Sequence, residues 1–355
     1  MAYLSYDYTG NEDEVFDRPR SNCGVVGICG HKDAATLAYL SLYSLQHRGQ
    51  ESAGIATADG QRIYRHIGMG LVAEVFSNAE IFQHLPGTMA IGHNRYSTTG
   101  STRLLNAQPL LVNSQAGPIA ISHNGNFVNA RALRSELERE GAIFQTSSDT
   151  EIVLHLLARS KAKNMVSKLQ EAFGKIRGAY SITLLTRDKL YAIRDPNGFR
   201  PLCIGKKRFT HIVASESCAL DLIGGHYVRD IEPGEIVVFK QDGSAPQSYS
   251  LQGRGQTPRR ACIFEFVYFS RPDSKIFHEN ADRARRRLGK NLALQSQVDA
   301  DIVIAVPDSS NTAAVGYSRR SGIKFELGLI RNHYIGRTFI QPGQAIRDFK
   351  VKVKF

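Results

Sequence analysis

The sequence predicts two regions of different fold class, an α+β region over residues 23–255 and an α/β region from residue 256 onward. Three observations support this division. Short apolar strands separated by turns such as Asp59-Gly60 dominate the first region. In the second, a buried-type strand at 301–306 leads into a helix and another strand, as in a βαβ unit. Between them, residues 243–260 are rich in Gly, Ser, Gln and Pro, which is typical of a linker.

Composition narrows the class of protein. The 355 residues are 42% hydrophobic and 22% charged, as expected for a globular chain of two or three domains. No apolar run approaches the roughly 18–20 residues of a membrane span. The net charge of +12 is uneven: residues 259–355 hold 18 basic and 9 acidic residues, and residues 1–258 hold 27 and 24. The excess of basic residues after residue 258 suits a polyanionic ligand. Because zinc-finger and RNP motifs are absent, the ligand is expected to be a small phosphorylated molecule rather than nucleic acid.

The stretch beginning at Cys23 predicts a nucleophile. Residues 1–22 lack the basic start and apolar centre of a secretory signal, and we interpret them as a leader cut after Asn22. Cys23 would then carry a free amine with a pKa of about 7.7–8.0 beside a thiol with a pKa of about 8.5. The amine can activate the thiol without a histidine. The alternative is a buried strand cysteine. Five cysteines without paired spacing favour a reducing cytoplasm.

Next along the chain, apolar spacing predicts a helix over 34–45, and strands follow at 55–57 and 63–66. The segment Gln46–Ser52 closes the helix, and its simplest interpretation is a polar C-cap with Gly49 in a left-handed conformation. A further strand begins at Met89 and runs into a polar loop. In that loop Arg95 offers the planar, bidentate donors that suit an α-carboxylate.

A strand at 119–122 is followed by His123-Asn124-Gly125. The Asn124 side-chain amide and the Gly125 N–H are the donor pair that an oxyanion hole needs, although Asn-Gly is equally a common turn. Asp149 precedes a helix over 152–158. It is either an N-cap or a partner for a substrate ammonium, and the two roles are compatible.

The remaining elements of the first region follow the same periodicities. We expect helices at 129–140 and 166–176, and strands at 179–186, 190–194, 202–205, 212–215 and 234–240. Cys203 and Cys218 have apolar neighbours, which predicts that both are core residues.

In the second region we expect a strand over 261–269, a helix over 280–296, a strand over 301–306 and a helix over 312–320, with a further strand over 326–330. Ser309 and Ser310 stand at a strand-to-helix turn, where an α/β sheet binds phosphate, or where a plain N-cap would stand. One βαβ unit is too short for a complete parallel sheet, so we expect the chain to be truncated at its C-terminal end.

The order and the residue identities of these motifs resemble those of a known family. Cys-Gly-Val-Val-Gly at 23–27, Gly-His-Asn-Arg-Tyr-Ser-Thr at 92–98 and His-Asn-Gly-Asn at 123–126 resemble class II glutamine amidotransferases, which are N-terminal-nucleophile hydrolases. Further motifs at 264–274, 306–310 and 332–342 resemble the amidophosphoribosyltransferases among them. The resemblance covers nearly all of residues 23–355. It implies an αββα sandwich followed by a partial type I phosphoribosyltransferase domain.

The resemblance also implies a set of roles. Cys23 would attack the glutamine amide, with Asn124 and Gly125 holding the oxyanion. Residues implied for glutamine binding are Arg48, Arg95, Tyr96, Thr98 and Asp149. Ammonia would pass internally and displace pyrophosphate at C1 of phosphoribosyl pyrophosphate, the first committed step of purine biosynthesis. Residues implied for the phosphoribosyl side are Ser309, Ser310, Arg331, Tyr334 and Arg337.

The implied cofactors are Mg²⁺, at Ser309, and a [4Fe–4S] cluster with Cys262 as one ligand. A cluster needs about four thiolates, so the other ligands and the Asp-Asp phosphoribosyl loop are expected beyond Phe355. The implied domains are a propeptide over 1–22, a glutaminase domain over 23–255 and an incomplete phosphoribosyltransferase domain over 256–355. Implied partners are glutamine, phosphoribosyl pyrophosphate, purine nucleotides as feedback inhibitors, and identical subunits in a homotetramer, with no membrane or nucleic acid.

Two rival functions are weighed against this one. Another class II amidotransferase would share the glutaminase half, but residues 264–274 and 306–310 disfavour its acceptor domains. A nucleic-acid-binding regulator on a phosphoribosyltransferase-like fold would explain the basic second region. It would have no use for a nucleophile such as Cys23, and its DNA affinity would fall steeply with salt.

Overall fold

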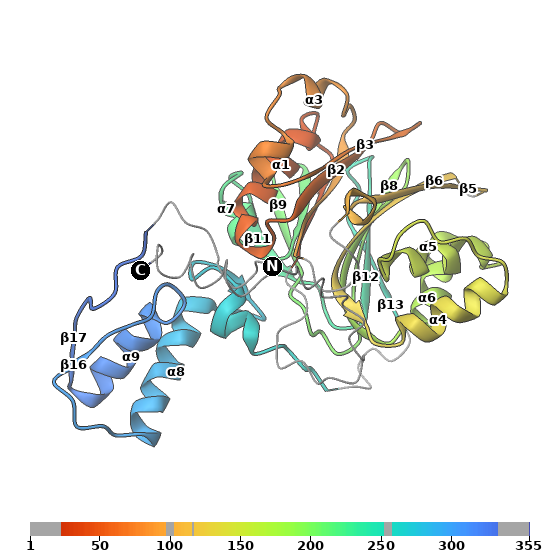
Figure 1. Cartoon of the computed structure of the whole chain (residues 1–355). Coiled ribbons are helices and arrows are strands. Elements are labelled where there is room, and N and C mark those ends of the chain that lie inside the picture. Colours follow the sequence, from red (N-terminus) through yellow and green to blue (C-terminus); the bar gives the residue numbers. More distant parts are fainter. Residues whose placement is uncertain (1–22, 97–102, 116, 252–257, 333–354) are drawn as a thin grey trace, which may run out of the picture.

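The computed structural model describes residues 23–96, 103–115, 117–251, 258–332 and 355, and the expected leader and the 252–257 boundary lie outside these ranges. Two antiparallel sheets stack face to face, and helices cover their outer faces (Figure 1). A smaller unit built on two helices lies beside this sandwich (Figure 1).

The first sheet has seven strands in the order β11-β9-β10-β1-β4-β2-β3. Their bounds are β1 Gly24–Cys29, β2 Ser52–Ala58, β3 Ile63–Met69, β4 Met89–Arg95, β9 Cys203–Lys207, β10 Thr210–Ala214 and β11 His226–Asp230. The central strand β1 pairs with β4 and β10, and every residue from Gly24 to Cys29 is buried. Burial on both faces explains why its sequence is continuously apolar or small rather than alternating.

The second sheet has six strands in the order β13-β12-β8-β7-β6-β5. Their bounds are β5 Leu110–Ser114, β6 Gly117–Phe127, β7 Gly178–Leu185, β8 Lys189–Arg194, β12 Glu235–Lys240 and β13 Gln247–Ser250. Strand β13 lies inside the segment that the sequence predicts as a linker. It is exposed along its length, so its polar composition suits an edge strand as well as a linker.

Helices bury one face each against these sheets. The first sheet is covered by α1 (Ala34–Ser44) and α7 (Cys218–Asp221), beside the short helices α2 (Val72–Val75) and α3 (Glu80–Gln83). Helices α4 (Ala130–Arg139), α5 (Thr150–Arg159) and α6 (Met165–Lys175) cover the second sheet. A third apolar cluster, with Val25, Ile91 and Phe239 among its members, fills the space between the sheets. The predicted αββα sandwich is confirmed.

The second region differs from its prediction at three places. The buried strand predicted over 301–306 is reduced to two paired residues, Ile302 and Val303, and Ile302 is 51% exposed. Residues 261–269 form no strand, because Glu265–Phe269 is the π-helix η3, which buries Glu265 and Phe269 on one side. An apolar run of this length suits a strand or a helical turn equally, so periodicity could not decide between them. Residues 326–330 are also not a strand, since the parallel pair consists of β16 (Ile302–Val303) and β17 (Lys324–Phe325).

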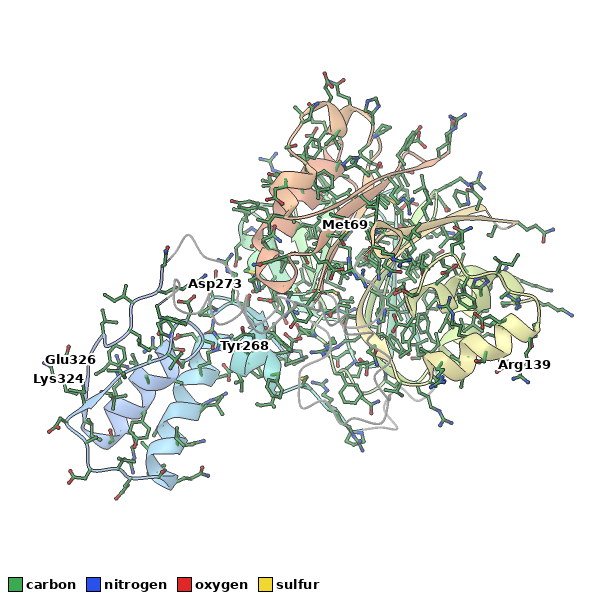
Figure 2. The ribbon with its side chains drawn as sticks, viewed as in Figure 1. Met69, Arg139, Tyr268, Asp273, Lys324 and Glu326 are labelled. Carbon is green, nitrogen blue, oxygen red and sulfur yellow. The ribbon has the colours of Figure 1, made fainter. Side chains whose placement is uncertain are left out.

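The predicted helices of the second region are confirmed as α8 (Ala281–Gln295) and α9 (Asn311–Ser321), which pack against each other. The hairpin β14 (Lys275–Ile276) and β15 (Glu279–Asn280) precedes α8. Figure 2 shows Tyr268 and Asp273 near the sandwich, whereas Lys324 and Glu326 lie at the far side of this unit. Within the described ranges, the structure contains no helix of the length and apolarity that crossing a membrane requires.

Candidate active site

Cys23 stands directly before β1 with an exposed fraction of 8%. Its Sγ accepts a hydrogen bond from the Tyr96 N–H at 3.4 Å and lies 3.6 Å from the Tyr96 carbonyl oxygen. Burial raises the thiol pKa, and the Tyr96 hydrogen bond and the charge of Arg95 offset only part of that effect. The thiol therefore rests in its neutral form and needs a proton acceptor before it can act as a nucleophile.

Alternation along the strands places Cys23 and Asn124 on facing sides of the two sheets. Val25, two residues after Cys23, belongs to the cluster between the sheets, as does Ala120, which shares a face of β6 with Asn124. His93 bridges the sheets, because its Nε2 lies 3.1 Å from the His123 carbonyl oxygen. The Asn124 side chain is fully buried, and neither of its polar atoms has a partner among the described residues. Such an amide is available to bind a ligand.

Gly125 lies on β6 where one edge of that strand is open, since pairing with β5 reaches only Ile121. On this edge the His123 N–H donates to Gln108 Oε1 at 2.8 Å and the Phe127 N–H donates to Asp149 Oδ2 at 2.9 Å. Backbone directions alternate along a strand, so the Gly125 N–H points to the same edge, between these two. Residues 123–126 are paired strand rather than a turn, which removes the Asn-Gly turn interpretation.

The conformation of Gly125 explains its residue type. Its φ is +154°, and a Cβ there would lie 2.0 Å from the Ala179 carbonyl oxygen and 2.7 Å from His123 Nε2. Only glycine lets the neighbouring strand approach this closely.

Asp149 stands at the start of α5 and does not cap it with its side chain. Burial opposes ionisation of its carboxyl, yet His123 and the Phe127 N–H hold the pKa below its usual value. Asp149 is thus a buried carboxylate beside the open edge of β6 at Gly125. Its negative charge contributes to the raised pKa of the Cys23 thiol. A buried anion in this position suits a substrate cation.

Arg95 ends β4 and is 5% exposed. Its guanidinium pairs with Glu51 at 3.2 Å. Its positive charge lowers the pKa of the Cys23 thiol, against the larger effect of burial. Gly49 packs against the Arg95 backbone, where a Cβ would lie 2.5 Å from the carbonyl carbon. Gly49 has an extended φ of −160°, so its role is this close approach and the left-handed C-cap interpretation is wrong. Thr98 lies outside the described residues.

Arg48 does not lie where the sequence analysis expects it. It is fully buried and pairs with Glu216 through Nε, and with Glu265 through Nη2 at 2.6 Å. Arg200 Nη1 lies 3.4 Å from Glu265, and His47 Nε2 lies 2.8 Å from Glu216. Two carboxylates occupy the Arg48 guanidinium, so the prediction that it binds glutamine is replaced by a structural role at the junction of the two regions.

On the phosphoribosyl side, Ser309 is half-buried in the turn before α9. The Ser310 hydroxyl donates back to the Val306 carbonyl and does not cap the helix. Asp308, which lies in the same turn as the two serines, forms an ion pair with Arg331. Tyr334 and Arg337 lie outside the described residues.

Cys262 is partly exposed and precedes η3. Cys29, Cys203 and Cys218 are buried, and burial raises the thiol pKa of each, so the prediction that Cys203 and Cys218 are core residues is confirmed. In the part of the chain that the structure describes, no group of three or more His, Cys, Asp or Glu residues could hold a metal ion. The described residues therefore fit one cluster ligand and not a cluster.

Three residues described above were not predicted from the sequence: His123, beside Asp149, and Glu216 and Glu265, which pair with Arg48. Glu265 carries a signal, because it is an isolated charge in the apolar run 261–269. His123 adjoins the Asn-Gly pair and could have been considered with it. Glu216 has no local signal, since its partners Arg48 and Ser274 are distant in the chain.

Comparisons with known proteins agree with this geometry. Residues 93–221 match a family model described as a glutamine amidotransferase domain. The chain is 49% identical to amidophosphoribosyltransferase 1 of Arabidopsis thaliana chloroplasts, over 99% of this chain and 62% of that protein. It is 47% identical to the Bacillus subtilis amidophosphoribosyltransferase, over 94% of this chain and 69% of that protein.

A solved structure of the B. subtilis glutamine phosphoribosylpyrophosphate amidotransferase, complexed with ADP and GMP, superposes with a TM-score of 0.83 at 46% identity. The match covers 92% of this chain and 70% of that one. The chain spans about three-fifths of the length of the Arabidopsis relatives.

Proposed function

The chain belongs to the amidophosphoribosyltransferase family, and from this premise we propose that it releases ammonia from glutamine at Cys23 and transfers it to phosphoribosyl pyrophosphate. The products would be glutamate, pyrophosphate and 5-phosphoribosylamine. The observation that carries the proposal is the buried Cys23 thiol facing an Asn124 amide whose two polar atoms lack partners among the described residues.

In the first half-reaction, Cys23 Sγ bonds to the side-chain amide carbon of glutamine, and the carbonyl oxygen becomes an oxyanion. The Asn124 amide and the Gly125 N–H donate to that oxygen. Collapse of this intermediate breaks the carbon–nitrogen bond, and ammonia leaves with the proton taken from the thiol. Water then hydrolyses the thioester to glutamate and restores the thiol.

The proton acceptor is the Cys23 α-amine, which exists once residues 1–22 are removed. In the described structure, Cys23 Sγ has hydrogen-bond contacts only with the Tyr96 backbone, and no histidine or carboxylate among the described residues is bonded to it. The raised thiol pKa makes such an acceptor necessary.

Four residues would hold the rest of glutamine. Arg95, with Tyr96 and Thr98 beside it, binds the α-carboxylate, and Asp149 binds the α-ammonium. The depressed pKa of Asp149 supports this role, since a carboxylate that is ionised at neutral pH pairs with an ammonium without a proton transfer.

In the second half-reaction, ammonia displaces pyrophosphate at C1. We assign Ser309 and Ser310 to the phosphate side, with Arg331, Tyr334 and Arg337 nearby in sequence, and Ser309 to Mg²⁺, which would neutralise the pyrophosphate. The location of both serines in a turn at the N-terminus of α9 supports phosphate binding. Cys262 is proposed as one ligand of an iron–sulfur cluster.

Partners and location complete the proposal. The related B. subtilis enzyme was solved with ADP and GMP, which supports purine nucleotides as feedback inhibitors here. We further propose a cytoplasmic homotetramer that binds neither membrane nor nucleic acid. The cysteines of the described structure form no disulfide, which fits a reducing compartment.

The test is an intact mass measured before and after treatment with diazo-oxo-norleucine, an electrophilic glutamine analogue. We expect loss of residues 1–22 and one adduct, which peptide mapping places on Cys23. Cys23→Ala is the matched control and should gain no adduct. A folded full-length protein that stays uncleaved and unlabelled would refute the proposal.

A further inference from the structure

His123 lies beside the proposed ammonium site although no role has been assigned to it. It is 3% exposed, and its ring stacks on Phe127 with centroids 4.5 Å apart. Its Nδ1 lies 3.1 Å from Thr150 Oγ1 and 3.6 Å from Asp149 Oδ1. Its Nε2 has no partner among the described residues and lies against Gly125. One ring edge thus faces Asp149, and the other faces the backbone of the proposed oxyanion donor.

The surrounding hydrogen bonds indicate which nitrogen donates. Thr150 Oγ1 accepts from Gln108 Nε2 at 3.0 Å, and its own hydrogen is directed toward Asp149 Oδ1 at 3.5 Å. With that hydrogen directed to Asp149, the remaining lone pair of the hydroxyl accepts, and on this basis we assign the donated proton to His123 Nδ1. Gln108 also fixes the His123 backbone, because its Oε1 accepts the His123 N–H.

We propose that His123 is a positioning residue that orients Asp149 toward the α-ammonium of glutamine, which makes the site selective for substrates with an α-amino group. This inference rests on the proposed function. The Phe127 N–H holds Asp149 Oδ2, and His123 with Thr150 holds the side of Oδ1. A carboxylate held at both oxygens cannot rotate away from its ligand, and such support sets binding geometry.

The experiment compares two substitutions in the full chain. His123→Asn keeps an N–H donor near the Nδ1 position, whereas His123→Gln moves its donor toward the Nε2 position. Each variant is assayed for ammonia release from glutamine and from glutaramate, which is glutamine without the α-amino group.

We expect His123→Gln to raise KM for glutamine by about tenfold or more, the effect of weakening one hydrogen-bonded contact to a charged group. KM for glutaramate should change less than about twofold. His123→Asn should restore most of the glutamine KM. A purely structural role would move both substrates together and would give no recovery with Asn.

His155 supplies the matched control. Its ring also packs on a phenylalanine, Phe144, with centroids 4.3 Å apart, and its Nε2 lies 3.6 Å from Glu151 Oε1. His155→Gln should leave both KM values unchanged. If His123→Gln does not fold, as judged by thermal unfolding, Thr150→Val serves instead, because it removes the acceptor of the Nδ1 proton together with the hydroxyl contacts to Gln108 Nε2 and Asp149 Oδ1. It should raise the glutamine KM selectively.

Equal changes for both substrates, or equal KM values for the Asn and Gln variants, would overturn the role of His123 while leaving the proposed function intact. A wild-type enzyme that releases no ammonia from glutamine would instead refute the proposed function. These outcomes are distinguishable, since the wild-type assay precedes every comparison.

Discussion

The buried carboxylate of Glu265, in the second region, forms ion pairs with two arginines of the first region. Its side chain is fully buried and contacts Arg48 at 2.6 Å, Arg200 at 3.4 Å and the Ser270 hydroxyl at 3.2 Å. Together with Glu216 the cluster balances two arginines against two glutamates. Glu265→Ala would remove a buried carboxylate that both Arg48 and Arg200 contact.

Breaking a buried ion pair on one side costs about 3–5 kcal/mol of unfolding free energy. We expect Glu265→Ala to lose this amount, a large share of a typical stability of about 5–15 kcal/mol. Glu265→Gln also removes the negative charge, but it keeps the side-chain shape and an acceptor oxygen for Arg48, so we expect a smaller loss of about 1.5–3 kcal/mol.

The assay is urea unfolding of the full chain, with the midpoint and slope fitted for each variant. The control is Glu279→Gln, because Glu279 pairs with Arg287 at the same 2.6 Å distance but on the surface. Solvent screens that exposed pair, so Glu279→Gln should change the unfolding free energy far less than Glu265→Gln. Equal losses for Glu265→Gln and Glu279→Gln would refute the claim that burial gives the junction its energy.

Three further predictions concern the site and pH. Asn124→Ala should lower kcat for glutamine hydrolysis by about 100- to 1000-fold with little change in KM, measured by ammonia release, because it removes one oxyanion donor. An unchanged kcat would exclude Asn124 from that role. Gly125→Ala should cost at least about 1–3 kcal/mol in urea unfolding, because its Cβ would meet the Ala179 carbonyl oxygen at 2.0 Å. Burial raises the pKa of Asp195 to about 6 despite Arg194, so its protonated form favours folding, and this contribution is lost as pH rises from about 4 through 6. Asp195→Asn should therefore flatten the stability profile in that window, and an unchanged slope would contradict the shift.

Local sequence determined most secondary structure of the first region. Helix α1 and the strands β2 and β4 lie within a few residues of their predicted bounds, because 3.6- and 2-residue periodicities report which side chains face a core. The same patterns could not classify residues 261–269. Strand β13 was missed, since an exposed edge strand has no apolar face.

For the site, the sequence alone selected Cys23, Asn124, Gly125 and Asp149, residue types whose chemistry is visible in their motifs. Tertiary structure decided what each contacts. It turned the Gly125 N–H to the open edge of β6 and set His123 against Asp149. It also buried Arg48 between Glu216 and Glu265, 168 and 217 residues away. Charge pairing over such separations depends on which surfaces the fold removes from water, and no local pattern contains that information.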